Sequence, residues 1–142
     1  MSLNYPIGKW LSKIYKHNRK YISERLTSYN LNSSEASLLM YLYSEGDGIN
    51  QDEIAIDMGL DKATISRVIK QLVDKDYIIR KKSSEDKRVY IVHLNDKANS
   101  IKSIISNTYQ SWFTLITEDI PEKEVDVILK NLEKMFNKVK NE

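Results

Sequence analysis

The stretch that decides the fold is residues 51–75, QDEIAIDMGLDKATISRVIKQLVDK. It contains two helical patterns, 51–58 and 61–75, separated by Gly59-Leu60. Asp61 is a natural N-cap because its carboxylate can accept hydrogen bonds from the free amides of a first helical turn. Apolar residues of the second pattern recur at helical spacing and are Ile65, Val68, Ile69 and Leu72. The stretch therefore predicts two helices around a tight turn, with the second packed inward along one face.

The other face of the 61–75 helix is polar. Its outward residues are Lys62, Thr64, Ser66, Arg67, Lys70 and Gln71. An Arg side chain can hold a guanine edge with two hydrogen bonds, a Gln can do the same for adenine, and Ser or Thr can meet several base edges or a phosphate. An ordinary amphipathic surface helix carries the same residue types, so this helix alone leaves both interpretations open.

A β-hairpin is predicted directly after this helix. The β-like runs 77–81 and 89–94 are joined by the polar segment 82–87. The cations around its tip are Arg80, Lys81, Lys82, Lys87 and Arg88. A thin cationic hairpin can enter the narrow minor groove of DNA, where the phosphate potential is focused. Asp86 can hold the Arg88 guanidinium in one rotamer, so that less entropy is lost on binding.

Long amphipathic helices flank this region. With only four glycines and two prolines in 142 residues, helices should dominate. They are expected over 7–26, from Ser33 or Ser34 to 43, over 95–115, and from Pro121 to 139. A hydroxyl of Ser33 or Ser34 should cap the second helix, and Asn95 should cap the fifth. The apolar stripe at 125–139 is too long to stay exposed, so it predicts a homodimer, with a monomeric bundle as the alternative.

The net charge of +2 is unevenly distributed. Residues 61–90 hold nine bases and five acids, 9 − 5 = +4, whereas residues 45–60 carry −5. A basic segment beside an acidic one indicates a local surface for polyanions, although a solvated helix face would have the same charge.

Several classes of protein are excluded at this stage. The chain has no cysteine, which excludes disulfides and thiolate zinc sites and fits a reducing cytoplasm. No apolar run reaches the roughly 18–20 residues of a membrane span, and residues 1–5 do not resemble the start of a secretion signal. His17 and His93 have no partners with catalytic or metal-ligand spacing. We therefore expect a cytoplasmic protein that is not an enzyme and holds no metal or cofactor.

The segment from Gln51 to Leu72 resembles the core of the multiple antibiotic resistance regulator (MarR) family. The resemblance continues through Tyr77-Ile78-Ile79-Arg80 and Asp86-Lys87-Arg88 and ends at Leu94-Asn95-Asp96-Lys97. Members of that family are dimeric bacterial DNA-binding regulators, mostly repressors, and many are released by small phenolic or other ligands. The chain departs from the family at Asp76, where a glycine is usual; aspartate still tolerates a left-handed backbone.

The resemblance and the residue patterns together predict a mainly α fold with a small β-hairpin wing. This is a winged helix-turn-helix flanked by N- and C-terminal dimerisation helices. We expect a dimerisation helix in residues 1–30, the DNA-binding lobe in 31–94, and C-terminal dimerisation helices in 95–142, together forming one compact unit.

The predicted function is a sequence-specific transcriptional regulator, expected to repress, that binds a pseudo-palindromic operator in double-stranded DNA as a homodimer. The DNA-contacting residues are predicted to be Lys62, Thr64, Ser66, Arg67, Lys70, Gln71, Lys81, Lys82, Asp86, Lys87 and Arg88. A winged-helix module that binds protein without an operator is the alternative, because the same fold does both.

A ligand site is implied by the resemblance, at the junction of the dimerisation helices and the DNA-binding lobe. In this chain the junction should gather Lys13, His17, Tyr41, Tyr109 and Trp112. Aromatic walls with one or two cations would suit a small aromatic or phenolic acid. Ordinary core packing would explain the same aromatic residues, and regulation by protein abundance alone would need no ligand.

Overall fold

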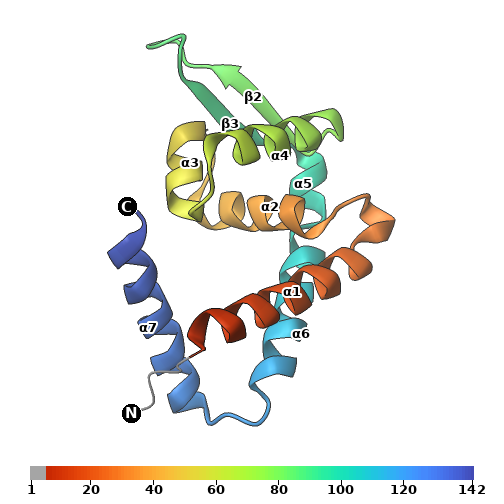
Figure 1. Ribbon diagram of the computed structural model, residues 1–142. Coiled ribbons are helices and arrows are strands. Elements are labelled where there is room, and N and C mark those ends of the chain that lie inside the picture. The colour runs from red at the N-terminus through yellow and green to blue at the C-terminus, as the bar shows by residue number, and fades with distance from the viewer. Residues whose placement is uncertain (1–5) are drawn as a thin grey trace.

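The computed structural model describes residues 6–142 (Figure 1). Residues 1–5, on which the expectation about secretion rests, lie outside the described residues. The elements are α1 (Ile7–Arg25), a 3-10 turn (Thr27–Tyr29), α2 (Ser33–Glu45), β1 (Ile49–Asn50), α3 (Gln51–Met58), α4 (Lys62–Asp74), β2 (Ile78–Lys82), β3 (Tyr90–Leu94), α5 (Asp96–Ser100), α6 (Lys102–Thr117) and α7 (Glu122–Val139). The predicted fold class, mainly α with a small hairpin wing, is confirmed.

The helix-turn-helix forms as its sequence predicts. Gly59 ends α3 with φ +68°, a left-handed conformation that glycine adopts at no steric cost. Asp61 is the N-cap of α4, and its Oδ1 accepts a hydrogen bond from the Thr64 amide at 2.7 Å. At the far end, Asp76 has φ +64°, which agrees with the left-handed backbone expected there. The four apolar positions of α4 are all buried.

The second helix begins with a cap that the sequence reasoning misplaced. Its N-cap is Asn32, whose side chain accepts from the Glu35 amide while the Glu35 carboxylate accepts from the Asn32 amide, both at 2.9 Å. This reciprocal capping box leaves no role as N-cap for Ser33 or Ser34. The Ser33 amide instead donates to Ser23 Oγ in α1 at 2.9 Å, which ties the two helices together.

The wing belongs to a three-stranded antiparallel sheet of order β1-β3-β2. In the hairpin, Ile78 pairs with Leu94 at the base and Lys82 with Tyr90 near the tip. The strand β1, which pairs Ile49 with Val92, was not predicted, because a two-residue strand has too little length to show alternation. Figure 1 shows the hairpin projecting beyond α4, away from α6 and α7.

The helix predicted to run from residue 95 to 115 is broken into α5 and α6 at Ile101, so that prediction was wrong in this detail. The Ile101 amide bonds to Ala98 O, three residues back, and its side chain is buried. Asn95 does not cap α5 with its side chain; its Nδ2 donates to Asp76 O at 3.1 Å and fastens the end of the wing to the end of α4.

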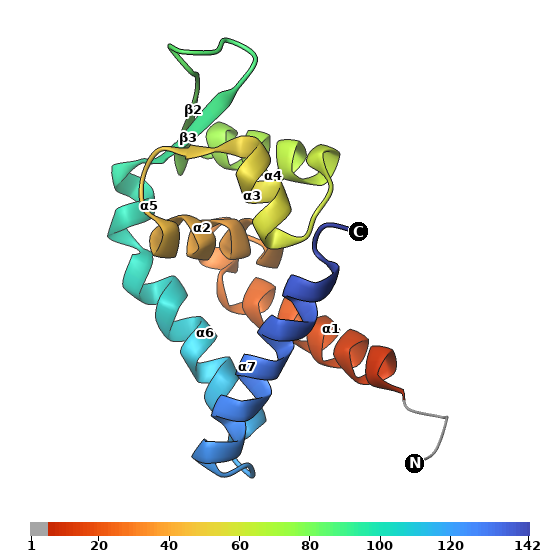
Figure 2. The same ribbon diagram turned by 90° about the vertical axis from the view of Figure 1, so that its left-hand side faces the viewer.

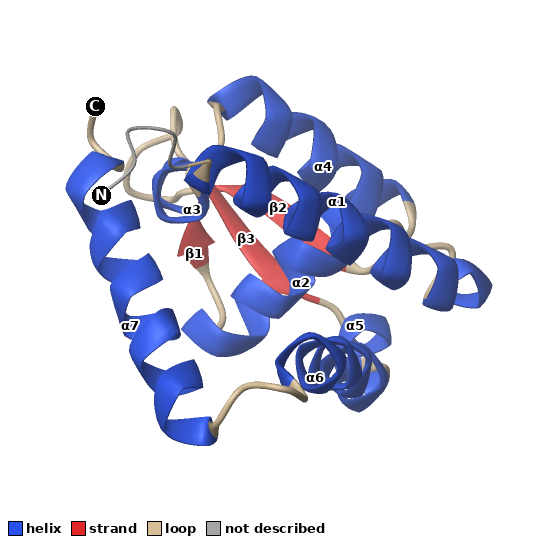
Figure 3. Ribbon diagram, turned by 60° about the horizontal axis from the view of Figure 1, so that its bottom comes forward, coloured by secondary structure: helices blue, strands red, loops and turns tan. Residues whose placement is uncertain are grey.

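The helices α5 and α6 lead away from the helix-turn-helix and the wing, and α7 leads back toward them. Figure 2 shows α5 and α6 descending on one side and α7 returning toward α3, and Figure 3 shows α7 set apart from α6 by a loop. The core is built from α2, α4 and the sheet together with buried residues of α1, α3, α5 and α6. In α7 a single residue, Val125, is buried. None of the helices found in residues 6–142 has the length and apolar character of a membrane span.

Candidate nucleic-acid interface

The six polar residues predicted for α4 all lie on its outward side or its flanks. Lys62, Arg67 and Lys70 are exposed, whereas Thr64, Ser66 and Gln71 are half-buried. The Lys62 ammonium lies 3.9 Å from Asp52, but both side chains are mostly exposed, so this ion pair is weak and leaves Lys62 able to reach a phosphate.

The wing holds its arginine in a fixed position. Arg88 Nε donates to Asp86 Oδ1 and Arg88 Nη2 to Asp86 Oδ2, both at 3.1 Å. The Arg88 amide also donates to Oδ1 at 3.0 Å. These bonds hold the pKa of the Asp86 carboxyl below its usual range. Because the Arg88 side chain is still 90% exposed, the carboxylate orients it without covering it.

The remaining wing cations differ in their surroundings. Lys81, Lys82 and Lys87 are exposed and near the tip. The Arg80 guanidinium stacks 4.3 Å above the Tyr90 ring, so it serves the hairpin itself. The tip is closed by hydrogen bonds from the Ser83 amide to Val89 O at 2.8 Å and from the Val89 amide to Asp86 O at 3.0 Å. The wing therefore presents three exposed lysines near its tip in addition to Arg88.

A buried ion pair that the sequence reasoning missed anchors the end of α4. The Glu35 carboxylate is fully buried, and Lys75 Nζ lies 2.7 Å from its Oε2 and 2.9 Å from its Oε1. Lys75 Nζ also donates to Asn30 O at 2.8 Å. The spacing Asn32-x-x-Glu35 could have predicted the cap, but its lysine partner lies 40 residues away and only the tertiary fold brings it close.

Three of the five residues predicted at the ligand junction come together. Lys13 and His17 of α1 and Trp112 of α6 line a groove of about 380 Å³, and Trp112 Nε1 donates to His17 Nδ1 at 3.0 Å. Tyr41 does not line this groove, because its hydroxyl donates to Asp57 Oδ2 at 2.8 Å. Tyr109 packs on the core instead, and burial raises the pKa of its hydroxyl to about 12.

The two histidines take structural positions. His17 accepts the bond from Trp112. His93 is half-buried, and its Nδ1 lies 3.3 Å from Asp47 Oδ1. Within residues 6–142, no group of three or more His, Cys, Asp or Glu side chains could hold a metal ion.

A helix-turn-helix with a polar, basic recognition face and a cationic wing defines the class of winged helix-turn-helix regulators. Comparison with known proteins agrees: the family profile named MarR matches residues 31–90. A crystal structure of a MarR transcriptional regulator from Methanosarcina mazei Go1 is 30% identical, covers 93% of this chain and 94% of its own, and superposes with a TM-score of 0.85. The chain belongs to the MarR family.

Two further relatives add detail. The HTH-type transcriptional regulator MgrA of Staphylococcus aureus is 31% identical over 90 residues, which are 63% of this chain and 60% of MgrA. A mutant MarR from E. coli, solved in complex with operator DNA, is 19% identical, covers 92% of this chain and 93% of its own, and has a TM-score of 0.79, a likeness of fold alone. Because members of the family are transcription regulators, the enzyme alternative is excluded.

Proposed function

We propose that the protein is a sequence-specific transcriptional regulator that binds double-stranded DNA as a homodimer at a pseudo-palindromic operator. The observation that carries this proposal is Arg88, exposed at the end of a projecting wing and oriented by two hydrogen bonds to Asp86. An arginine fixed in this way suits the minor groove. The operator complex of the E. coli relative supports the proposal.

The outward face of α4 is proposed to lie in the major groove. Arg67 is the candidate for a base edge, with Thr64, Ser66 and Gln71 beside it. Lys62 and Lys70 are candidates for phosphates, as are Lys81, Lys82 and Lys87 of the wing. Two such lobes, related by a two-fold axis, would contact half-sites roughly one helical turn apart.

The homodimer is supported by apolar side chains that the single chain leaves exposed. In α1 they include Ile7, Trp10, Leu11 and Ile14, and in α7 Val127, Ile128, Leu129, Leu132, Met135 and Val139. Apolar surface of this extent is rare on a monomer and is typical of an interface. We assign residues 1–30 and 95–142 to dimerisation and 31–94 to DNA binding, in a cytoplasmic protein that represses transcription.

Selection of bound sequences from a random DNA pool tests this function directly. The expected result is an enriched palindrome with two half-sites, bound by a dimer in sedimentation experiments at micromolar concentration. Enrichment of no sequence, together with weak binding that does not depend on salt, would favour the alternative of a protein-binding winged helix. A monomer in sedimentation would overturn the dimer.

A small aromatic or phenolic acid is proposed as the effector that releases the operator. The supporting observation is the groove between α1 and α6, where Trp10 and Trp112 supply aromatic walls and Lys13 supplies a cation. A ligand there would act by binding one spacing of the two DNA-binding lobes more tightly, typically with ~1–3 kcal/mol of coupling.

A screen of aromatic acids against the protein–operator complex tests the effector. Release by one compound, lost in Lys13→Ala while the melting temperature of the free protein is unchanged, is the expected result. If no compound alters either operator affinity or melting temperature, the groove is only packing for the dimer and the protein acts through its abundance.

A further inference from the structure

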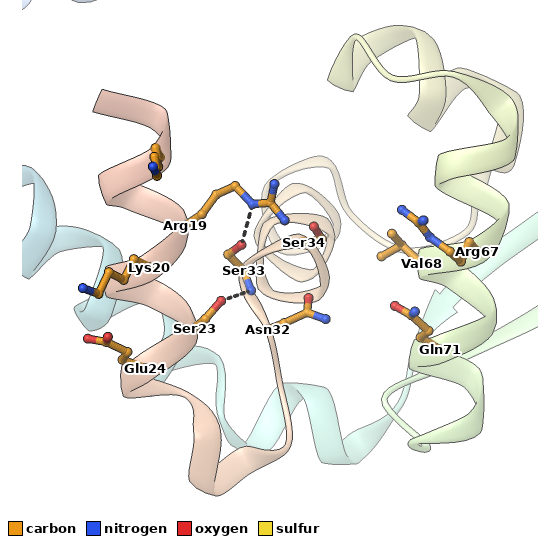
Figure 4. Close-up of a pocket in the computed structure, with 11 residues that line it drawn as sticks. Arg19, Lys20, Ser23, Glu24, Asn32, Ser33, Ser34, Arg67, Val68 and Gln71 are labelled. Carbon is orange, nitrogen blue, oxygen red and sulfur yellow. Dashed lines mark hydrogen bonds between the residues drawn. The ribbon is translucent and has the colours of Figure 1, made fainter. Parts of the chain in front are cut away.

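A second groove lies beside the recognition helix, between α1, the start of α2 and α4 (Figure 4). Its volume is about 570 Å³. The side chains that matter here are Lys16, Arg19 and Lys20 of α1, Ser34 of α2, and Arg67 and Gln71 of α4. Neither the α4 pattern nor the wing motif points to the three α1 cations, which the fold brings to the same groove as Arg67. In Figure 4, Arg19 reaches toward the start of α2, and Lys20 lies on the outer side of α1.

The groove is strongly basic. Its lining includes four cations, Lys16, Arg19, Lys20 and Arg67, against one carboxylate, Glu24. All four cations are exposed, and the ion pairs found among residues 6–142 involve other cations. The contrast with Arg88 is clear, because Arg88 forms an ion pair with Asp86, whereas none of these four cations forms an ion pair within residues 6–142.

Two features of the structure set the positions of the three α1 cations. Lys16, Arg19 and Lys20 are spaced by three and four residues, which puts them on one face of α1. Arg19 Nε donates to Ser33 Oγ at 3.4 Å, which directs its guanidinium toward the start of α2. The positive end of the α2 dipole therefore adds to the same potential.

We propose that this groove binds the DNA phosphate backbone, so that α1 is a third DNA-contacting element beside α4 and the wing. The inference rests on the proposed function and extends it. Arg67 and Gln71 belong both to the groove and to the outward side of α4, so a strand flanking the major groove that α4 occupies would pass along α1. Several exposed cations along one groove suit a polyanionic backbone, whose phosphates repeat along the strand.

The consequence is a division of α1 into two parts. Its first half carries the exposed apolar residues assigned to the dimer, and its second half carries the basic groove. One rigid helix of 19 residues would then join the dimer interface to the DNA backbone.

The test compares Lys16→Ala/Lys20→Ala with Lys130→Ala/Lys134→Ala, which removes two exposed lysines at the same spacing from α7. Binding to the selected operator and to a random duplex is measured between 50 and 300 mM salt. In the groove variant, the slope of log affinity against log salt concentration should be smaller in magnitude by about two, and the affinity for both duplexes should fall by the same factor. Melting temperature and dimerisation should match the wild type.

Equal salt slopes in the groove and control variants would overturn the proposal. A rise in the wild-type melting temperature with millimolar inorganic phosphate, lost in the groove variant while DNA binding is kept, would also overturn it and identify a small-anion site. If the wild type binds neither duplex, the proposed function itself fails. If the wild type binds DNA and the groove variant binds it with the same affinity and salt slope, only the proposal about the groove fails.

Discussion

The ring of Phe136 in α7 lies directly over Gly59, at the turn between α3 and the recognition helix. A Cβ on Gly59 would lie 2.8 Å from Phe136 Cε1. The last helix, set apart from the lobe over most of its length, thus meets it at the helix-turn-helix itself. Through this contact, a displacement of α7 would press directly on the turn that positions α4.

Gly59→Ala should lower the free energy of unfolding by about 1–3 kcal/mol, because it combines a left-handed backbone with a clash against Phe136. The double variant Gly59→Ala/Phe136→Ala should lose less than the sum of the two single changes, since removing the ring removes the clash. Urea unfolding at one fixed protein concentration measures the cycle. Strictly additive losses would mean that the Phe136 ring moves aside at no cost in free energy.

Lys75→Met should cost about 3–5 kcal/mol of stability, because it leaves the buried Glu35 carboxylate without its cation. Glu35→Gln in the same chain should recover part of this loss, since the glutamine side chain is uncharged and can still accept the hydrogen bond from the Asn32 amide. Lys62→Ala is the control: its exposed pair with Asp52 should contribute less than about 1 kcal/mol. Similar losses in both lysine variants would contradict the structural role of Lys75.

Arg67→Ala should weaken operator binding by about 1–3 kcal/mol and relax the sequence preference at one position of each half-site. Lys70→Ala should instead weaken all duplexes alike and lower the salt slope by about one. Repeating the sequence selection with each variant distinguishes them. Should Arg67→Ala weaken all sequences equally, Arg67 contacts only phosphate.

Arg88→Ala should weaken operator binding roughly tenfold or more, while the dimer and the melting temperature stay nearly unchanged, because the side chain is exposed. Asp86→Ala should have the same effect in weaker form, since Arg88 keeps its charge and loses only its orientation. Anisotropy titrations and thermal melts measure the two properties. Unfolding of Arg88→Ala would show that the residue is structural.

Stability should fall on the acid side only below about pH 4. Hydrogen bonds hold the pKa of three carboxyls below the usual range. Asp47 accepts one from His93, Asp61 from Thr64, and Asp86 from Arg88. A carboxyl with a lowered pKa stabilises the fold above its unfolded pKa, and this is lost as pH falls through the folded value. Circular dichroism of wild type and Asp47→Asn checks this, and the variant should be the less sensitive to acid.

The sequence by itself determined the recognition helix and the wing. Asp61, the apolar positions of α4 and the Asp86-x-Arg88 pair act over a few residues, so their structure follows from local hydrogen bonding and helical period. Their outward residues could be named because burying the apolar face leaves only the opposite face for a partner.

Only the tertiary structure decided the contacts between distant segments. Lys75 reaches Glu35, Phe136 covers Gly59, and three α1 cations line the same groove as Arg67, although long stretches of chain separate each pair. The same holds for the ligand junction, because Tyr41 bonds to Asp57 and Tyr109 packs on the core, contacts that no local pattern predicts. Local patterns fix which face of a helix is buried, but the partner that covers it depends on how all the helices pack at once.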